Sequence, residues 1–238
     1  MGLLRVFLSG VVLTACTTAS TSIVTPDEES TTTVGGGTVD EPGATTPTAI
    51  RLSQTDDSKP MEPGYAVGCA DKVGSFETSW YRVFALAPQK FENRYFDISR
   101  VNFAVQTATG DQRVKVFVGT YDGTMGDPEL DLSKVEMLGQ TTIDVAPTNV
   151  GETLQANFAA VGIPSHSNLI IEIRTDGHPQ VAQRGNPTGT YLYLGATPGA
   201  ESWPGYVRAP ACGLPNPEMT STVGPLRSHL IMSVSGTN

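Results

Sequence analysis

Cysteine has the richest side-chain chemistry in this sequence, and Cys16 has the most informative surroundings. It follows Leu13, Thr14 and Ala15 at the end of a short apolar run near the N-terminus. The thiolate is the nucleophilic form of cysteine, and small residues before it suit a peptidase that cuts there. The pattern predicts an export signal that is cut close to Cys16.

Residues 1–15 have the layout of an export signal. Arg5 is the only charged side chain of this stretch, and an apolar run over residues 6–13 follows it. The run is much shorter than the roughly 20 residues that cross a bilayer. Leu13-Thr14-Ala15-Cys16 resembles the lipobox of bacterial lipoproteins. The resemblance implies a diacylglyceryl group on Cys16, cleavage of residues 1–15, and acylation of the new amine, with palmitate as an example.

This resemblance also implies a location in the bacterial cell envelope. Thr17 follows the cysteine in place of aspartate, which in enterobacterial lipoproteins favours the outer membrane over the inner one. The membrane would then be a partner through the N-terminal lipid, and an envelope protein or a glycan is a candidate second partner. The alternative is an ordinary secretory signal with Cys16 merely close to the cleavage point.

A low-complexity linker is expected over residues 16–64. It is rich in threonine, serine, glycine and proline, lacks aromatic residues, and carries eight acidic side chains against two basic ones. Such a segment buries too little apolar surface to fold. We therefore expect a disordered acidic tether between the lipid anchor and a folded domain at residues 65–238. Much of the chain's net charge of −9 comes from this tether.

Cys69 and Cys212 remain after the lipid site. In an exported protein two remaining cysteines most simply form a disulfide. Closing so long a loop removes on the order of 5 kcal/mol of entropy from the unfolded chain. The bridge would place the first and last segments of the domain side by side. Two buried free thiols are the alternative.

The other candidates for catalysis or metal binding form no motif. His166, His178 and His229 have no metal-ligand spacing, and no Gly-x-Ser-x-Gly, His-Glu-x-x-His or Gly-Lys-Ser/Thr sequence occurs. We expect no enzyme activity, no catalytic residue and no cofactor. The carboxylates of Asp122–Asp131 suggest calcium, but Pro128 and the spacing depart from the Asp-x-Asp-x-Asp-Gly loop, which favours a solvated turn. The scattered lysines and arginines argue against nucleic-acid binding.

Trp203 and Tyr206 are the candidate ligand-binding residues. They lie in a Pro- and Gly-rich segment over residues 201–206 that predicts a loop. An exposed indole near a phenol can stack on a sugar ring or anchor a protein partner. The alternative is that Trp203 packs beneath the loop and Tyr206 belongs to a strand, because large aromatic side chains are mostly buried. Of the two tryptophans, Trp80 is expected to be the more buried.

Short alternating strands are the elements that must position these residues. No helical stripe of three turns occurs between residues 65 and 238, and turn residues separate the apolar runs. Strands are expected at residues 81–86, 101–105, 114–118, 135–145, 152–158, 168–175, 190–194 and 229–234. Gly110 marks a turn that predicts a hairpin between the second and third of these. The pattern predicts an all-β fold, an antiparallel β-sandwich of jelly-roll type, with an up-and-down barrel as the alternative.

Residues 80–86, 101–118 and 205–213 resemble a β-sandwich module that recurs in secreted and surface-attached bacterial proteins. The likeness extends over most of residues 69–236, and such modules are usually accessory units beside enzymes or repeats. The leading hypothesis is a non-enzymatic binding or structural module anchored to the envelope. The alternatives are a carbohydrate-binding accessory domain and a hydrolase whose site assembles only in the fold.

Overall fold

The computed structural model describes the folded part of the chain, at residues 48–55, 61, 62, 64–72, 74–89, 91, 93–177, 190–199, 201–223 and 227–238. The expected leader, Cys16, the linker up to residue 47 and His178 lie outside the described residues. Within the described residues, no helix has the length and apolar character needed to cross a membrane.

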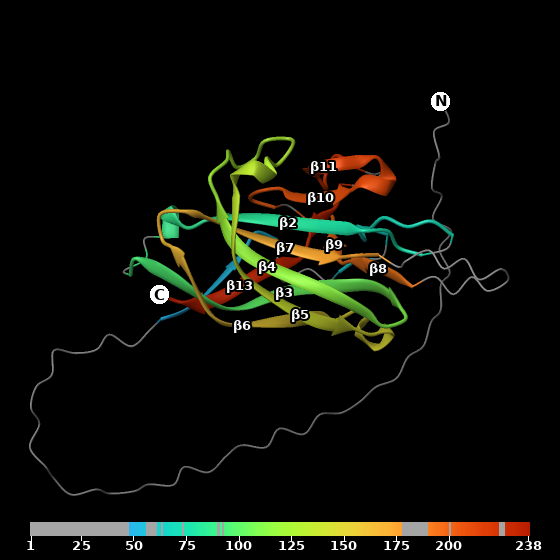
Figure 1. The fold of residues 1–238 in the computed structure, drawn as a ribbon, viewed down its shortest axis with the longest axis horizontal. Coiled ribbons are helices and arrows are strands. Elements are labelled where there is room, and N and C mark those ends of the chain that lie inside the picture. The colour runs from blue at the N-terminus through green and yellow to red at the C-terminus, as the bar shows by residue number, and fades with distance from the viewer. Residues whose placement is uncertain are drawn as a thin grey trace, which may run out of the picture. The chain divides into compact units, whose positions relative to one another are not determined.

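The described strands form two packed antiparallel sheets (Figure 1). One has the order β1-β13-β3-β6, with β8 also paired to β3, and the other has the order β11-β10-β2-β7-β4-β5. The strands of the first sheet are β1 (Ala49–Ser53), β13 (Met232–Thr237), β3 (Tyr95–Thr109), β6 (Thr153–Pro164) and β8 (Tyr191–Leu194). Those of the second are β11 (Leu214–Met219), β10 (Gly205–Ala209), β2 (Thr78–Ala85), β7 (Asn168–Thr175), β4 (Gln112–Tyr121) and β5 (Val135–Val145).

Short elements complete the described structure. A small sheet pairs β9 (Ala196–Thr197) with β12 (His229–Leu230). Four 3-10 turns occur among the described residues: η1 (Ala87–Gln89), η2 (Leu132–Lys134), η3 (Pro147–Asn149) and η4 (Pro210–Cys212). The chain crosses repeatedly from one large sheet to the other, for example from β2 to β3 and from β6 to β7. The predicted all-β, antiparallel, jelly-roll-like sandwich is therefore confirmed.

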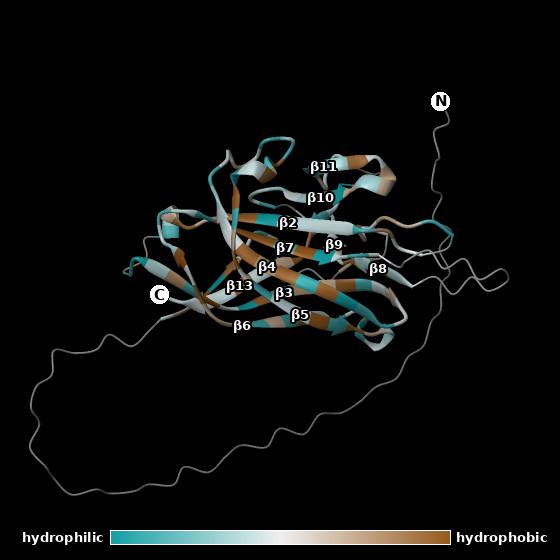
Figure 2. Cartoon of the chain, viewed as in Figure 1, coloured by the Kyte–Doolittle hydropathy of each residue, from teal (hydrophilic) through white to brown (hydrophobic). Residues whose placement is uncertain are grey.

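The core lies between the two large sheets because each strand turns alternate apolar residues inward. Leu169, Ile171 and Ile173 of β7 are fully buried in this core, as their spacing predicts. Hydrophobic residues recur along β4, β7 and β3 (brown in Figure 2). Trp80 of β2 is also fully buried, and its Nε1 donates to the carbonyl of Val67 at 2.9 Å. The expectation for Trp80 is confirmed.

The predicted β-hairpin around Gly110 is wrong. β3 and β4 do follow each other through a turn at Gly110, whose φ is +90°. They belong to different sheets, however, since β3 pairs with β13, β6 and β8 whereas β4 pairs with β7 and β5. Both strands turn their valines toward the shared core, so alternation alone does not distinguish a hairpin from a crossing between sheets.

The folded domain begins earlier than residue 65. β1 lies within the predicted linker, yet it pairs with β13 from Ala49 opposite Thr237 to Ser53 opposite Ser233. Leu52 joins the main core at 7% exposure. The linker assignment is therefore wrong for residues 49–53, because a partner strand from the far end of the chain supplies the hydrogen bonds that the local sequence does not.

The predicted disulfide is confirmed. Cys69 and Cys212 are bonded across 143 residues of sequence, with their Cα atoms 6.0 Å apart. Cys69 precedes β2, and Cys212 ends η4 after β10, the neighbour of β2. The bridge therefore ties together the two ends of the predicted domain.

Candidate functional site

Trp203 is the exposed aromatic residue that the sequence singled out. It lies in the loop before β10 and is 41% exposed. Cζ3 and Cε3 of its indole lie beside Gly126, where an added β-carbon would be 3.3 and 3.5 Å from them. Gly126 has a φ of +87°, a conformation that favours glycine. The indole is thus supported from one side by the loop over residues 122–131.

A buried arginine holds the backbone of this tryptophan. Arg82 of β2 is fully buried, and its Nη1 donates to the carbonyl of Trp203 at 3.2 Å. Its Nη2 donates to Oε2 of Glu201 at 3.1 Å and to the carbonyl of Leu230 at 2.6 Å. The side chain of Glu201 is 8% exposed, so this is a buried ion pair. Both ends of the short Glu201–Trp203 segment are therefore bonded to one side chain.

Two more side chains complete this network. Nδ1 of His229 lies 2.6 Å from Oε1 of Glu201, which is the carboxylate oxygen on the side away from Arg82. Gln54 accepts from Nη1 of Arg82 at 3.1 Å, and its backbone carbonyl accepts from the amide of Ser202 at 3.1 Å. Arg82 of β2, His229 of β12 and Gln54, directly after β1, therefore fix the loop that presents Trp203.

The sequence analysis missed this network, although one signal was present. Arg82 stands at the inward phase of a strand between Trp80 and Phe84, which both face the core. A cation in that phase needs a buried partner. Nothing in the sequence identifies Glu201 and His229 as that partner set, because they lie more than a hundred residues away.

Tyr206 is not a ligand-facing residue, which corrects its assignment. It belongs to β10 and is 2% exposed. Its hydroxyl donates to the carbonyl of Asp127 at 3.1 Å, and burial raises its pKa to about 12. Tyr206 therefore holds the loop at Asp127, next to the glycine that the indole of Trp203 contacts. An aromatic residue at alternate positions of a strand faces one side only, and here that side is covered.

The loop over residues 122–131 covers a second, smaller core on the outer face of the six-stranded sheet. Its buried members are Tyr81, Val83, Tyr121, Leu130, Ile170 and Tyr206. The loop is closed against β11: the amide of Leu130 donates to the carbonyl of Pro217 at 2.9 Å, and that of Met219 to the carbonyl of Pro128 at 3.2 Å. The carboxylate-rich loop is thus packed and hydrogen-bonded.

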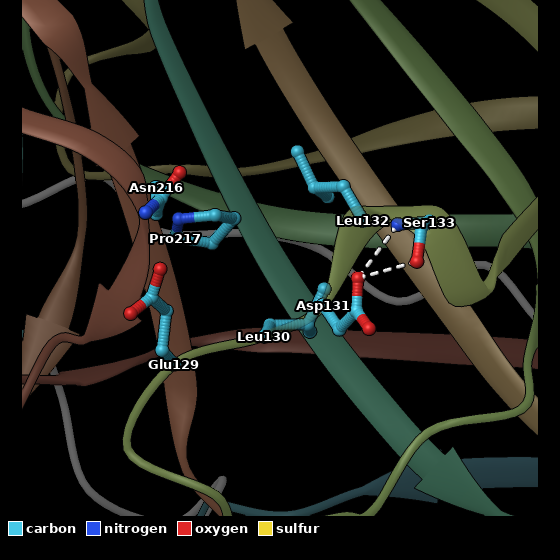
Figure 3. Close-up of a pocket in the computed structure, with 7 residues that line it drawn as sticks. All are labelled: Glu129, Leu130, Asp131, Leu132, Ser133, Asn216 and Pro217. Carbon is cyan, nitrogen blue, oxygen red and sulfur yellow. Dashed lines mark hydrogen bonds between the residues drawn. The ribbon is translucent and has the colours of Figure 1, made fainter.

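A pocket of about 330 Å³ opens beside this loop (Figure 3). It is lined by Glu129, Leu130, Asp131, Leu132, Ser133, Asn216 and Pro217. Figure 3 shows Glu129, Asn216 and Pro217 along one side and Asp131, Leu132 and Ser133 along the other. Leu130 is buried between the two sides, whereas Leu132 is 40% exposed.

One carboxylate of the pocket is committed to local structure. Oδ1 of Asp131 accepts from the amide of Ser133 at 2.9 Å and from its hydroxyl at 2.7 Å. These hydrogen bonds lower the pKa of Asp131, because they favour its ionised form. Asp131 therefore caps η2 and remains charged.

Metal-ligand sets are absent from the described residues, where no group of three or more His, Cys, Asp or Glu side chains is placed to hold an ion. This includes the loop Asp122–Asp131, which was weighed as a calcium site. His166 lies in the turn between β6 and β7, and His229 faces Glu201. The structure does not gather these two histidines into a metal site.

Comparisons with known proteins give a weak structural likeness. No protein-family model matches the sequence, and no curated protein matches it. Among solved structures the chain is similar to the cysteine protease and lectin-like domains of Cwp84, a surface layer associated protein of Clostridium difficile. The identity is 11% and the TM-score 0.44, over 69% of this chain and 33% of that one. The chain thus spans about a third of that protein chain, and likeness at this level does not establish a shared function.

Proposed function

We propose that this protein is a non-enzymatic binding module that a lipid holds at the bacterial cell envelope. The observation that carries the proposal is Trp203, an indole 41% exposed whose backbone is fixed by a buried ion pair. An exposed aromatic ring that is already ordered loses little conformational entropy when a ligand stacks on it. Its contact with Gly126 involves Cζ3 and Cε3, and the residue stays 41% exposed to such a ligand.

The buried charges near the indole support binding rather than catalysis. Arg82, Glu201 and His229 converge beneath the loop, where they contact one another, Gln54 and backbone carbonyls. A general acid or base needs to reach a substrate atom within hydrogen-bonding distance. These groups instead hold the Trp203 loop. Assays with ester, peptide and glycoside substrates should accordingly show no turnover.

The location is proposed from the N-terminal sequence. Leu13-Thr14-Ala15-Cys16 after a short apolar run supports lipidation of Cys16, and Thr17 supports the outer membrane over the inner one. Several acyl chains hold a protein stably at a membrane. The linker would then hold the domain close to the envelope, and Trp203 would be its binding residue.

Binding to an envelope fraction tests the proposal. The purified domain should bind envelope material from the source cells, and Trp203→Ala should weaken this binding about tenfold, the effect of one lost stacking contact. Tyr95→Ala is the matched control, since Tyr95 is 54% exposed and lies on β3 in the other sheet. Equal binding by the two variants would contradict the proposal.

A further inference from the structure

The indole of Trp203 and the pocket both adjoin the segment over residues 126–133. The indole packs on Gly126, and the pocket begins three residues later at Glu129 and ends at Ser133. This segment pairs with β11: Glu129 lies opposite Glu218, and the amide of Leu130 donates to the carbonyl of Pro217. Three residues of chain span at most about 11 Å, so Gly126 and Glu129 are within the reach of one extended ligand.

The pocket lining accepts hydrogen bonds more readily than it donates them. Two carboxylate side chains, Glu129 and Asp131, line the pocket, Ser133 and Asn216 both donate and accept, and no lysine, arginine or histidine lines it. Leu132 and Pro217 add apolar surface. This combination suits a ligand with many hydroxyl donors and apolar C–H faces, and it disfavours an anion.

The surroundings of the indole distinguish a small ligand from a protein partner. A stable protein interface buries about 800 Å² on each side around an apolar centre. Trp203 instead has exposed polar neighbours, Ser202 on its own segment and Asp127 on the supporting loop. A single aromatic ring among polar groups matches recognition of one sugar ring, with the pocket receiving a further ring.

We infer that the ligand of this face is an uncharged oligosaccharide, with one ring stacked on Trp203 and another in the pocket lined by Glu129, Leu132 and Asn216. This inference rests on the proposed binding function and names its ligand class. The indole supplies the stacking surface, Asn216 exchanges hydrogen bonds with hydroxyls, and Glu129 accepts from them.

The test begins with envelope material from the source cells, divided and treated with periodate, which cleaves vicinal diols, or with protease. Periodate should remove binding of the domain and protease should not. Calorimetry with neutral hexasaccharides of glucose, mannose, galactose and N-acetylglucosamine should then identify a binder. Trp203→Ala and Asn216→Ala should each weaken its Kd about tenfold, whereas Tyr95→Ala should not change it.

Charge variants and salt separate the ligand classes. Glu129→Gln keeps an acceptor oxygen and should change the Kd of a neutral sugar less than about threefold. A cationic ligand would instead lose at least tenfold and would respond strongly to salt. Protease-sensitive, periodate-resistant binding that still depends on Trp203 would overturn the sugar inference and leave the binding function standing. Envelope binding that ignores Trp203→Ala would overturn both.

Discussion

Replacing Arg82 with methionine should destabilise the domain by about 3–5 kcal/mol, because it removes one partner of a buried ion pair. Arg82 is fully buried, and its hydrogen bonds reach Glu201, Gln54 and the carbonyls of Trp203 and Leu230. Methionine fills much of the same length without donating to any of these groups. The carboxylate of Glu201 then keeps its contact with Nδ1 of His229 but loses the guanidinium.

A second substitution separates stability from the positioning of the loop. Glu201→Leu alone leaves Arg82 buried without its carboxylate and should also cost about 3–5 kcal/mol. The double variant buries neither charge, so its loss should be at least about 2 kcal/mol smaller than the sum of the single losses. Ligand binding should not recover in the same way, because the carbonyl of Trp203 still lacks its donor.

Urea denaturation of the three variants measures their free energies of unfolding. Binding to envelope material measures whether the loop still positions Trp203. Acrylamide quenching in a Trp80→Phe background reports on the indole of Trp203. If the loss of stability in the double variant equals the sum of the two single losses to within about 0.5 kcal/mol, the two side chains do not form a coupled pair. If the double variant binds as well as the unmodified protein, Arg82 does not position Trp203, and that part of the reasoning fails.

The remaining predictions concern other parts of the chain. Cys16→Ala should move the full-length protein from the detergent phase to the aqueous phase on partitioning, and an unchanged distribution would exclude lipidation there. Trp203→Ala should cost less than about 1 kcal/mol of stability, whereas Trp80→Ala should cost about 3–5 kcal/mol because Trp80 is fully buried. Reducing the Cys69–Cys212 bond should cost about 2–5 kcal/mol, measured by denaturation with and without reductant. Tyr206, whose pKa burial raises to about 12, favours its neutral form in the folded state. Its contribution to the free energy of unfolding is therefore present below the ordinary tyrosine pKa and is lost as pH rises through about 12. In Tyr206→Phe the free energy of unfolding should fall less steeply with pH in the alkaline range. An unchanged slope would contradict this assignment of the loss to Tyr206.

Strands with regular alternation could be predicted from the sequence. β7 has the expected bounds, because Asn168–Thr175 keeps one phase from end to end. β5 also has its expected bounds, Val135–Val145, although a register shift opposite Val118 and Gly119 places Val135 and Val145 on opposite faces. β3 is longer than expected because a register shift between Ile98 and Arg100 changes the inward set from Phe96 and Ile98 to Val101 and Phe103. A bulge of this kind breaks the period of two, which is the signal that sequence reading follows.

Other strands depend on distant partners and have little local signal. β1 has a short apolar pattern within a threonine-rich stretch, and its pairing with β13 makes it a strand. β11 contains Pro215 and Pro217, which argue against a strand in the middle of a sheet. It lies at the end of the strand order, next to β10 alone, where proline is tolerated.

The same limit applies to the candidate site. The composition of residues 201–206 predicts a loop that carries aromatic residues, but it does not say which ring faces outward. That outcome follows from the start of β10 at Gly205, which sets Tyr206 on the covered face, and from Arg82, which holds Trp203 in the loop. Both depend on contacts between residues more than a hundred positions apart.

β1 also affects how the domain responds to tension. Thr48 and Asn238 exchange backbone hydrogen bonds at 3.1 and 3.2 Å, so the folded chain starts and ends at the same point. A pull from the N-terminal side therefore loads the pairs between β1 and β13 one after another, starting at this end. Releasing residues 48–53 would add about 20 Å of extended chain outside the fold, at roughly 3.3 Å per residue. The Cys69–Cys212 bond lies further along the chain and would still hold the rest of the sandwich together. β1 is thus a short reserve of length that can yield before the domain unfolds.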